Sequence, residues 1–177
     1  MNFFNLFRSL RSILMGKASN ERKIKYMRSL GMKIGNDCRF NTMNFSTEPY
    51  LIEIGDHVAI AGGSAIITHD GAIWSFLEDF PDADVFGKIK IGNNVFISDN
   101  CTILPNTIIG DNCVVGAGSV VRGKFPENSV IIGNPAKILM KTSALKFLYS
   151  QNPGLLRTEK MTDEEKAPIV KKQFGIE

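Results

Sequence analysis

The fold is decided by residues 91–125, which read IGNNVFISDNCTILPNTIIGDNCVVGAGSVVRGKF. Branched aliphatic residues recur in this stretch at a strict spacing of six: Ile91, Ile97, Ile103, Ile109, Val115 and Val121. The position four residues after each aliphatic is small in five of the six hexads: Val95, Cys101, Thr107, Cys113 and Ser119, with Phe125 as the exception. Neither the helical period of 3.6 nor the strand period of 2 produces this pattern. A six-residue period indicates a parallel β-helix, in which each repeat is one short strand and a corner.

The geometry of such a solenoid explains the pattern. Three hexads close one triangular coil of about 18 residues, and successive coils stack at the strand spacing of roughly 4.8 Å. Each aliphatic then points inward and stacks on its equivalents, with the small residue beside it. Asparagine tolerates the left-handed backbone conformation, so we expect corners at four positions: Asn94, Asn100, Asn106 and Asn112. The sequence therefore predicts an all-β solenoid.

Breaks in the hexads divide the chain. The repeats begin at Ile34, slip across 44–51, resume at Ile54 and stop after Thr68. Residues 69–88 are too long for a corner, and a long loop within a regular scaffold is usually functional. We expect three regions: an N-terminal helical segment (1–33), the β-helix with its inserted loop (34–138, loop 69–88) and a C-terminal helical tail (139–177).

Both termini have helical patterns. The predicted N-terminal helices cover 1–15 and a segment that starts at Asn20 and ends before Gly31. They have two interpretations: they cap the open edge of the solenoid, or they form a basic amphipathic segment that contacts an anionic membrane surface. In the tail, Leu145 and Leu148 suggest a short helix, and Thr162 with Glu165 has the spacing of a capping box.

Composition excludes several classes of protein. Hydrophobic residues make up 44% and charged residues 22% of the chain, which is ordinary for a globular protein. The sequence has no apolar run of about 18 residues and no convincing signal peptide. The net charge is +3, and basic residues are concentrated near the N-terminus, where no nucleic-acid-binding motif is found. The cysteines occupy small inward slots, so we interpret them as packing residues of a protein in the reducing cytoplasm: Cys38, Cys101 and Cys113.

The chain has two histidines. His57 lies at the fourth position of a hexad, and we expect it to point outward from a strand as an ordinary surface residue. His69 stands where the solenoid gives way to the long loop, and catalytic groups concentrate on loops held by a rigid scaffold. Histidine is the side chain best suited to accept a proton near neutral pH. His69 is therefore the candidate catalytic residue.

Four motifs together resemble the hexapeptide-repeat acyltransferases: IGNNVFI (91–97), IGDN (109–112), GAGSVV (116–121) and GNPAK (133–137). The similarity is closest to the branch of maltose and galactoside acetyltransferases and of capsule and lipopolysaccharide O-acetyltransferases. It implies a left-handed parallel β-helix, a homotrimer with active sites between subunits, and acetyl-CoA as co-substrate without a metal. It also implies that His69 is the general base, oriented by Asp70, by Glu48 or by a backbone carbonyl.

The resemblance also suggests which residues bind the substrates. For CoA it implies that Phe96 lies near the acyl end of the site. The small residues that would line the pantetheine groove are Gly116, Ala117, Gly118 and Ser119. The cations that would bind the phosphates are Arg122, Lys124, Lys137 and Lys141. On the acceptor side, Glu48 and Asp70 are candidate contacts. Trp74 either stacks on a sugar ring or anchors its loop against a neighbouring subunit.

The function implied by this resemblance is direct acetyl transfer to a saccharide hydroxyl, in surface-polysaccharide biosynthesis. Two alternatives stay open: N-acetylation of an amino sugar or antibiotic, and a non-catalytic scaffold. The zinc lyases built on the same solenoid need three histidine ligands. A symmetric trimer of a chain with two histidines does not supply three distinct ones.

Overall fold

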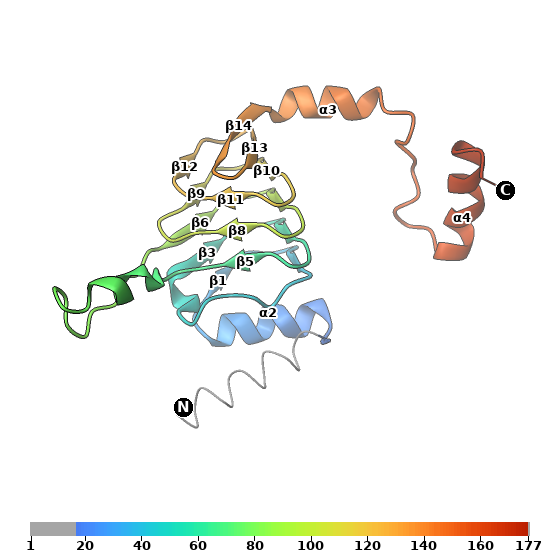
Figure 1. Ribbon diagram of the computed structural model, residues 1–177. Coiled ribbons are helices and arrows are strands. Elements are labelled where there is room, and N and C mark those ends of the chain that lie inside the picture. Colours follow the sequence, from blue (N-terminus) through green and yellow to red (C-terminus); the bar gives the residue numbers. More distant parts are fainter. Residues whose placement is uncertain (1–16, 177) are drawn as a thin grey trace. The chain divides into compact units, whose positions relative to one another are not determined.

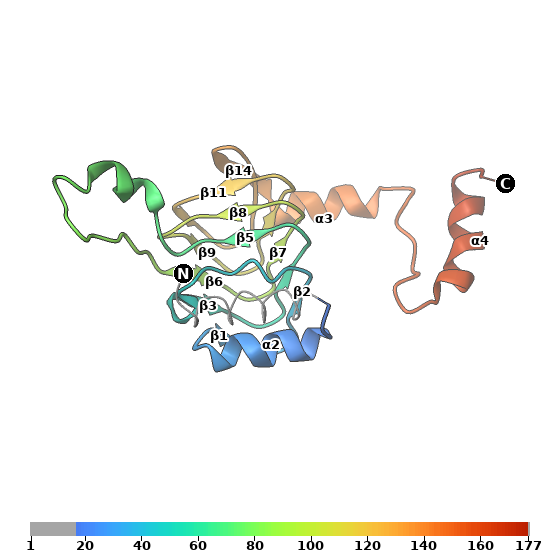
Figure 2. The ribbon, with the colours of Figure 1, turned by 60° about the horizontal axis from the view of Figure 1, so that its bottom comes forward.

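The computed structural model describes residues 17–176, so the helix predicted over 1–15 lies outside the described residues. The chain divides into two units, the first ending at Thr142 and the second covering Ser143–Glu177. The first unit is a stack of coils, which Figure 1 and Figure 2 show from two sides. The predicted parallel β-helix is therefore present.

The coils have three flat sides, and each side is a sheet of short strands. The first sheet contains β1 (Lys33–Ile34), β3 (Ile52–Ile54), β6 (Ile89–Ile91), β9 (Ile108–Ile109) and β12 (Lys124–Phe125). The second contains β2 (Arg39–Phe40), β4 (Ala59–Ile60), β7 (Phe96–Ile97), β10 (Val114–Val115), β13 (Ser129–Gly133) and β14 (Ala136–Lys141). The third contains β5 (Ala65–Ile66), β8 (Thr102–Ile103) and β11 (Val120–Val121). From β1 to β13, consecutive strands in the chain thus belong to different sheets, and parallel partners lie one coil apart.

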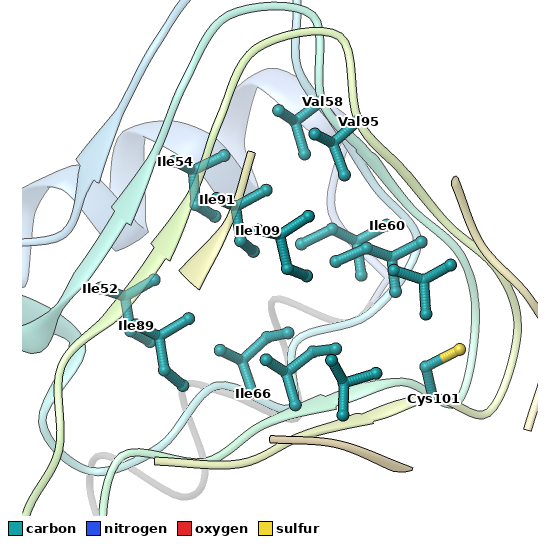
Figure 3. Packing of buried hydrophobic residues seen from close by; sticks show 14 of the residues in the cluster. Ile52, Ile54, Val58, Ile60, Ile66, Ile89, Ile91, Val95, Cys101 and Ile109 are labelled. Carbon is teal, nitrogen blue, oxygen red and sulfur yellow. The ribbon is translucent and has the colours of Figure 1, made fainter. Parts of the chain in front are cut away.

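The aliphatic residues of the hexads form the core. Figure 3 shows them pointing into the solenoid from all three sides, with Ile54, Ile91 and Ile109 stacked in one column. Ile97 and Ile103 are fully buried, and Ile91 and Ile109 are each 1% exposed. The predicted asparagines at the corners all have positive φ, between 52° and 65°. The sequence pattern therefore identified the inward and the corner positions correctly.

Phe125 is an exception, because its predicted position is wrong. Ile109 pairs with Ile91, 18 residues earlier, whereas Phe125 pairs with Ile109, only 16 residues earlier. The hexad after Val121 is therefore two residues short, and Phe125 fills an aliphatic position of the next coil rather than a small slot. Counting forward by six could not detect this shortening.

Each end of the solenoid is closed by a different element. At the first coil, helix α2 (Asn20–Ser29) binds the open edge through side chains. Asn20 donates to Cys38 O at 2.7 Å and accepts from Phe40 N at 2.8 Å, and Lys23 Nζ donates to Phe40 O at 3.3 Å. Ser19, not Asn20, occupies the N-cap position. Unpaired backbone N–H and C=O groups at an exposed strand edge can pair with another chain, and α2 forms hydrogen bonds with some of them.

At the other end the chain turns back. β13 continues the parallel ladder on β10, and β14 then pairs antiparallel with β13 across a cis Asn134–Pro135 bond. Residues 139–141 therefore belong to a strand and not to the predicted helical tail. Helix α3 (Thr142–Ser150) begins directly after them.

The second unit contains helix α4 (Asp163–Gln173), which begins with the predicted capping box. Thr162 Oγ1 accepts from Glu165 N, and Glu165 Oε2 accepts from Thr162 N at 2.8 Å. None of the helices within residues 17–176 is long and apolar enough to span a membrane.

Candidate active site

Most departures from the hexad spacing fall at one corner of the solenoid, where the chain passes from the third sheet to the first. We call it the loop corner; in successive coils it consists of residues 46–51, 67–88, 104–107 and 122–123. The first segment contains a 3₁₀ helix, η1 (Pro49–Leu51), and the last is the shortened hexad. The long loop projects from this corner, in green in Figure 1 and Figure 2.

His69 lies at the root of the long loop, directly after the fully buried Thr68. The two stems of the loop pair with each other: Gly87 N donates to Thr68 O at 2.7 Å, and Asp70 N donates to Val85 O at 2.8 Å. A β-bridge joins His69 to Phe86 between these bonds. The backbone of His69 is therefore fixed by the solenoid on one side and by the returning strand on the other.

The carboxylate of Glu48 contacts the His69 ring from the preceding coil. Glu48 Oε2 lies 3.1 Å from His69 Nδ1, and the Glu48 side chain is only 14% exposed. Three hydroxyl groups also donate to this carboxylate: Ser46 Oγ at 3.2 Å, Thr68 Oγ1 at 2.8 Å, and Thr47 Oγ1. These contacts favour Glu48, among the three groups considered, as the one that orients His69.

The ionisation of Glu48 bears on the tautomer of His69. Burial acts to raise the pKa of the Glu48 carboxyl, but hydrogen bonds from Thr47, Thr68 and His69 outweigh burial and lower that pKa. An ionised carboxylate only accepts hydrogen bonds. A hydrogen bond from His69 to this carboxylate therefore requires the proton on Nδ1, which leaves the lone pair on Nε2. The hydroxyl oxygens of Ser46 and Thr47 also lie 3.1 Å and 3.4 Å from Nδ1.

Asp70 makes different contacts from those of its neighbour. Its Oδ2 pairs with Arg122 Nη2 at 2.9 Å, and its Oδ1 accepts from Ala72 N at 3.1 Å. The second contact caps a 3₁₀ helix in the loop, η2 (Gly71–Phe76). Asp70 thus joins the loop to the solenoid and does not bind the His69 ring.

The predicted CoA residues do not gather around His69 within one chain. Gly116, Ala117 and Gly118 lie at the corner between the second and third sheets, and Phe96 lies on the second sheet with 42% exposure. The Ser119 side chain is fully buried, donates to Gly116 O and accepts from Gly133 N. The backbone of Ser119 is buried as well, and its carbonyl oxygen accepts from Thr102 N at 2.8 Å, so Ser119 does not offer a ligand a contact in this chain.

The predicted cations are also divided. Arg122 lies at the loop corner and is paired with Asp70, and Lys124 follows it as an exposed residue of β12. Lys137 and Lys141 are exposed residues of β14, on the second sheet. The two groups of cations therefore lie on different sides of the same chain.

The tip of the loop exposes aromatic side chains to solvent. Trp74 is 77% exposed and Phe76 is 53% exposed. The acidic residues that follow are exposed as well, as expected for a solvated face: Glu78, Asp79, Asp82 and Asp84. Both proposed roles of Trp74, sugar stacking and subunit contact, need this exposure.

His57 is a surface residue as predicted, but it does not lie in a strand. It occupies a corner with φ of 54°, equivalent to the corner asparagines, and its Nδ1 lies 2.6 Å from Asp37 Oδ2. The hexad register explains the error, because the fourth position belongs to the corner.

Sequence reasoning missed Ser46, Thr47 and Thr68 as partners of the Glu48–His69 pair. The only signal for Ser46 and Thr47 was the slip of the hexads across 44–51, and Thr68 stands where the hexads stop. That slip lies one coil before the long loop, at the same corner. Two breaks separated by one coil length could therefore have been combined into one site.

Comparison with known proteins agrees with this architecture. Residues 88–123 match the family model of the bacterial transferase hexapeptide (six repeats). Protein CapG of Staphylococcus aureus is 44% identical over 164 residues, which cover 91% of this chain and 92% of CapG. A 53-residue stretch, 30% of this chain and 27% of the relative, is 58% identical to WbbJ of Escherichia coli K12. The name of WbbJ provisionally assigns it to O-acetyl transfer in lipopolysaccharide biosynthesis.

A solved structure extends the comparison. The maltose O-acetyltransferase of Clostridium difficile 630 superposes with a TM-score of 0.56 at 30% identity, over 73% of this chain and 81% of that one. This chain belongs to the hexapeptide-repeat family of bacterial transferases. It is a left-handed β-helix and, as a member of this family, an acyltransferase.

Proposed function

We propose that this protein transfers the acetyl group of acetyl-CoA to a hydroxyl group of a saccharide, with His69 as the general base. The observation that carries the proposal is the Glu48–His69 contact of 3.1 Å, because a hydrogen bond to an ionised carboxylate needs the proton on Nδ1 and would leave Nε2 as the acceptor. The names of WbbJ and of the maltose O-acetyltransferase support the choice of a saccharide hydroxyl and a role in polysaccharide biosynthesis.

In the proposed reaction, His69 Nε2 removes the proton from the acceptor hydroxyl as its oxygen attacks the thioester carbonyl. The new C–O bond gives a tetrahedral intermediate, which collapses as the C–S bond breaks. The imidazolium then returns its proton to the thiolate of CoA. No covalent intermediate on the protein is required, and the buried thiols take no part.

The proposed active site includes a neighbouring subunit. His69 lies at the loop corner and Lys124 directly follows that corner, whereas Phe96 and Gly116–Gly118 lie on or beside the second sheet. A ligand that contacts both sets needs the loop corner of one chain to face the second sheet of another. We therefore propose a homotrimer in which each site is shared by two chains. The free cysteines also suit a reducing compartment, and we place the reaction in the cytoplasm.

The test follows release of CoA thiol from acetyl-CoA with a panel of sugars and amines. We expect turnover with a sugar lacking an amine, and a loss of about 10²- to 10⁴-fold in kcat for His69→Ala, the usual contribution of a general base. His57→Ala is the matched control, because it removes the other histidine from a different corner. Undiminished turnover by His69→Ala contradicts the proposed base, and transfer to amines alone replaces the hydroxyl acceptor with an amine.

A further inference from the structure

The two-residue connection Arg122–Gly123 is the shortest segment of the loop corner. Backbone bonds from Ile67 N to Ile103 O and from Leu104 N to Val121 O set the register of three successive coils here. In this register Ile67, Leu104 and Arg122 occupy equivalent positions. Arg122 therefore stands two coils beyond the root of the long loop and reaches back to it.

The target of Arg122 is the residue that organises the loop. Asp70 contacts Arg122 Nη2 at 2.9 Å, caps η2 through Ala72 N at 3.1 Å, and donates its own backbone N–H to Val85 O at 2.8 Å. Each contact joins Asp70 to a different part: the solenoid, the start of the loop and its returning strand. Asp70 also follows His69 directly, so a displacement of Asp70 moves the backbone of His69.

We propose that the Asp70–Arg122 ion pair is a latch that holds the root of the loop 69–88, and with it His69, in position on the solenoid. Arg122 is then a positioning residue for the acceptor side of the site, not a ligand for the phosphates of CoA as the resemblance suggests. The Asp70 carboxylate contacts Nη2 of the Arg122 guanidinium, and the Arg122 side chain is 56% exposed. This inference rests on the proposed function only in one respect, the assignment of the loop to the side of the site that binds the acceptor.

The test uses two readouts that need no acetyl transfer. The first is the rate at which chymotrypsin cleaves the loop, whose exposed Trp74 and Phe76 are substrates for it. The second is the Kd of CoA, measured by calorimetry. The variants are Arg122→Gln, Asp70→Asn, their double variant and the exchange Asp70→Arg with Arg122→Asp. Lys124→Gln is the matched control for cleavage, because it removes a positive charge two residues away.

We expect each single variant to be cleaved about two- to fivefold faster, the range that a partly exposed ion pair supports. The double variant should match the singles, and the exchange should restore slow cleavage, because the two residues act as a pair. Lys124→Gln should be cleaved at the rate of the unmodified protein, and the Kd of CoA should be the same for Arg122→Gln.

Three results would overturn the latch: cleavage unchanged in both single variants, equal acceleration in Lys124→Gln, or a Kd for CoA raised tenfold in Arg122→Gln. Failure of His69→Ala to lose activity contradicts the proposed base and leaves these binding and cleavage results unaffected. The latch and the proposed function are thus tested separately.

Discussion

Glu48→Gln is the most informative substitution, because it preserves the shape of the side chain and changes only its hydrogen-bonding character. In the native protein four donors converge on the carboxylate: the hydroxyls of Ser46, Thr47 and Thr68, and His69 Nδ1. A glutamine amide has one acceptor oxygen and two N–H donors. At least one of the four donors must therefore lose its acceptor or reverse its role.

The expected magnitude follows from the contact to His69. A hydrogen bond to a charged group contributes about 1.5–3 kcal/mol net, and each 1.36 kcal/mol on a barrier changes a rate tenfold. If the amide N–H₂ faces Nδ1, the favoured tautomer carries its proton on Nε2 and cannot act as a base. We therefore expect kcat to fall about 10- to 150-fold, with a smaller change in the KM for acetyl-CoA.

The assay combines steady-state kinetics with ¹⁵N NMR of the histidine rings. The chain has two histidines, so His57 gives an internal reference at a separate corner. We expect the His69 ring to be protonated at Nδ1 in the native protein and to shift toward Nε2 in Glu48→Gln. Ser46→Ala is the matched control: it removes one hydroxyl from the network but keeps the carboxylate, and should reduce kcat only about two- to tenfold.

Glu48 does not have this role if Glu48→Gln retains kcat within threefold of the native protein while its His69 ring keeps the Nδ1 proton. Protonation of the native ring at Nε2 would also refute the role, because the carboxylate would then not select the tautomer. A fall in kcat without a change in the ring would reduce Glu48 to a purely structural role.

Three further predictions concern stability and reactivity. Gly92→Ala should lower the free energy of unfolding by about 1–3 kcal/mol, because its new Cβ would lie 2.8 Å from Asp111 N of the next coil. Thermal unfolding measures this loss. Gly71→Ala is the control: no atom lies within 4 Å of its new Cβ, so the free energy of unfolding should change by less than about 0.5 kcal/mol. The pKa of Glu48 is lower in the folded than in the unfolded chain, so its stabilisation is complete above the unfolded pKa and is lost as pH falls through the folded one. Urea titrations below pH 4.5 should therefore show a shallower loss of stability in Glu48→Gln, and equal slopes would contradict this. Burial raises the pKa of all three thiols, so a thiol reagent should modify none of them in the folded protein and all after denaturation: Cys38, Cys101 and Cys113.

The core could be predicted because its pattern is local. Every inward aliphatic between Ile91 and Val121 is buried, and the corner asparagines have the backbone angles that their chemistry favours. Phe125 was misplaced because a hydrophobic residue is compatible with either inward slot, and only strand pairing shows the shortened hexad. His69 was identified as a candidate because the period stops beside it.

The partners of the His69 ring could not be predicted from the hexad period. The hexad spacing does not distinguish among Glu48, Asp70 and a backbone carbonyl as the group that orients His69. Adjacency favours Asp70, but successive residues of an extended segment point to opposite sides. Asp70 accordingly turns to Arg122, while Glu48 contacts the ring from the coil before.

The sequence by itself determined the repeat, and with it the triangular cross-section, the inward residues and the corners, because a six-residue period acts within each hexad. Only the tertiary structure decided which residues of different coils meet. Glu48 is 21 residues from His69, and Asp70 is 52 residues from Arg122. These contacts depend on the summed lengths of all the corners between them, including a long loop and a shortened hexad. The irregular corner segments 46–51, 67–88 and 122–123 therefore converge on one corner of the solenoid, and the candidate active site lies there.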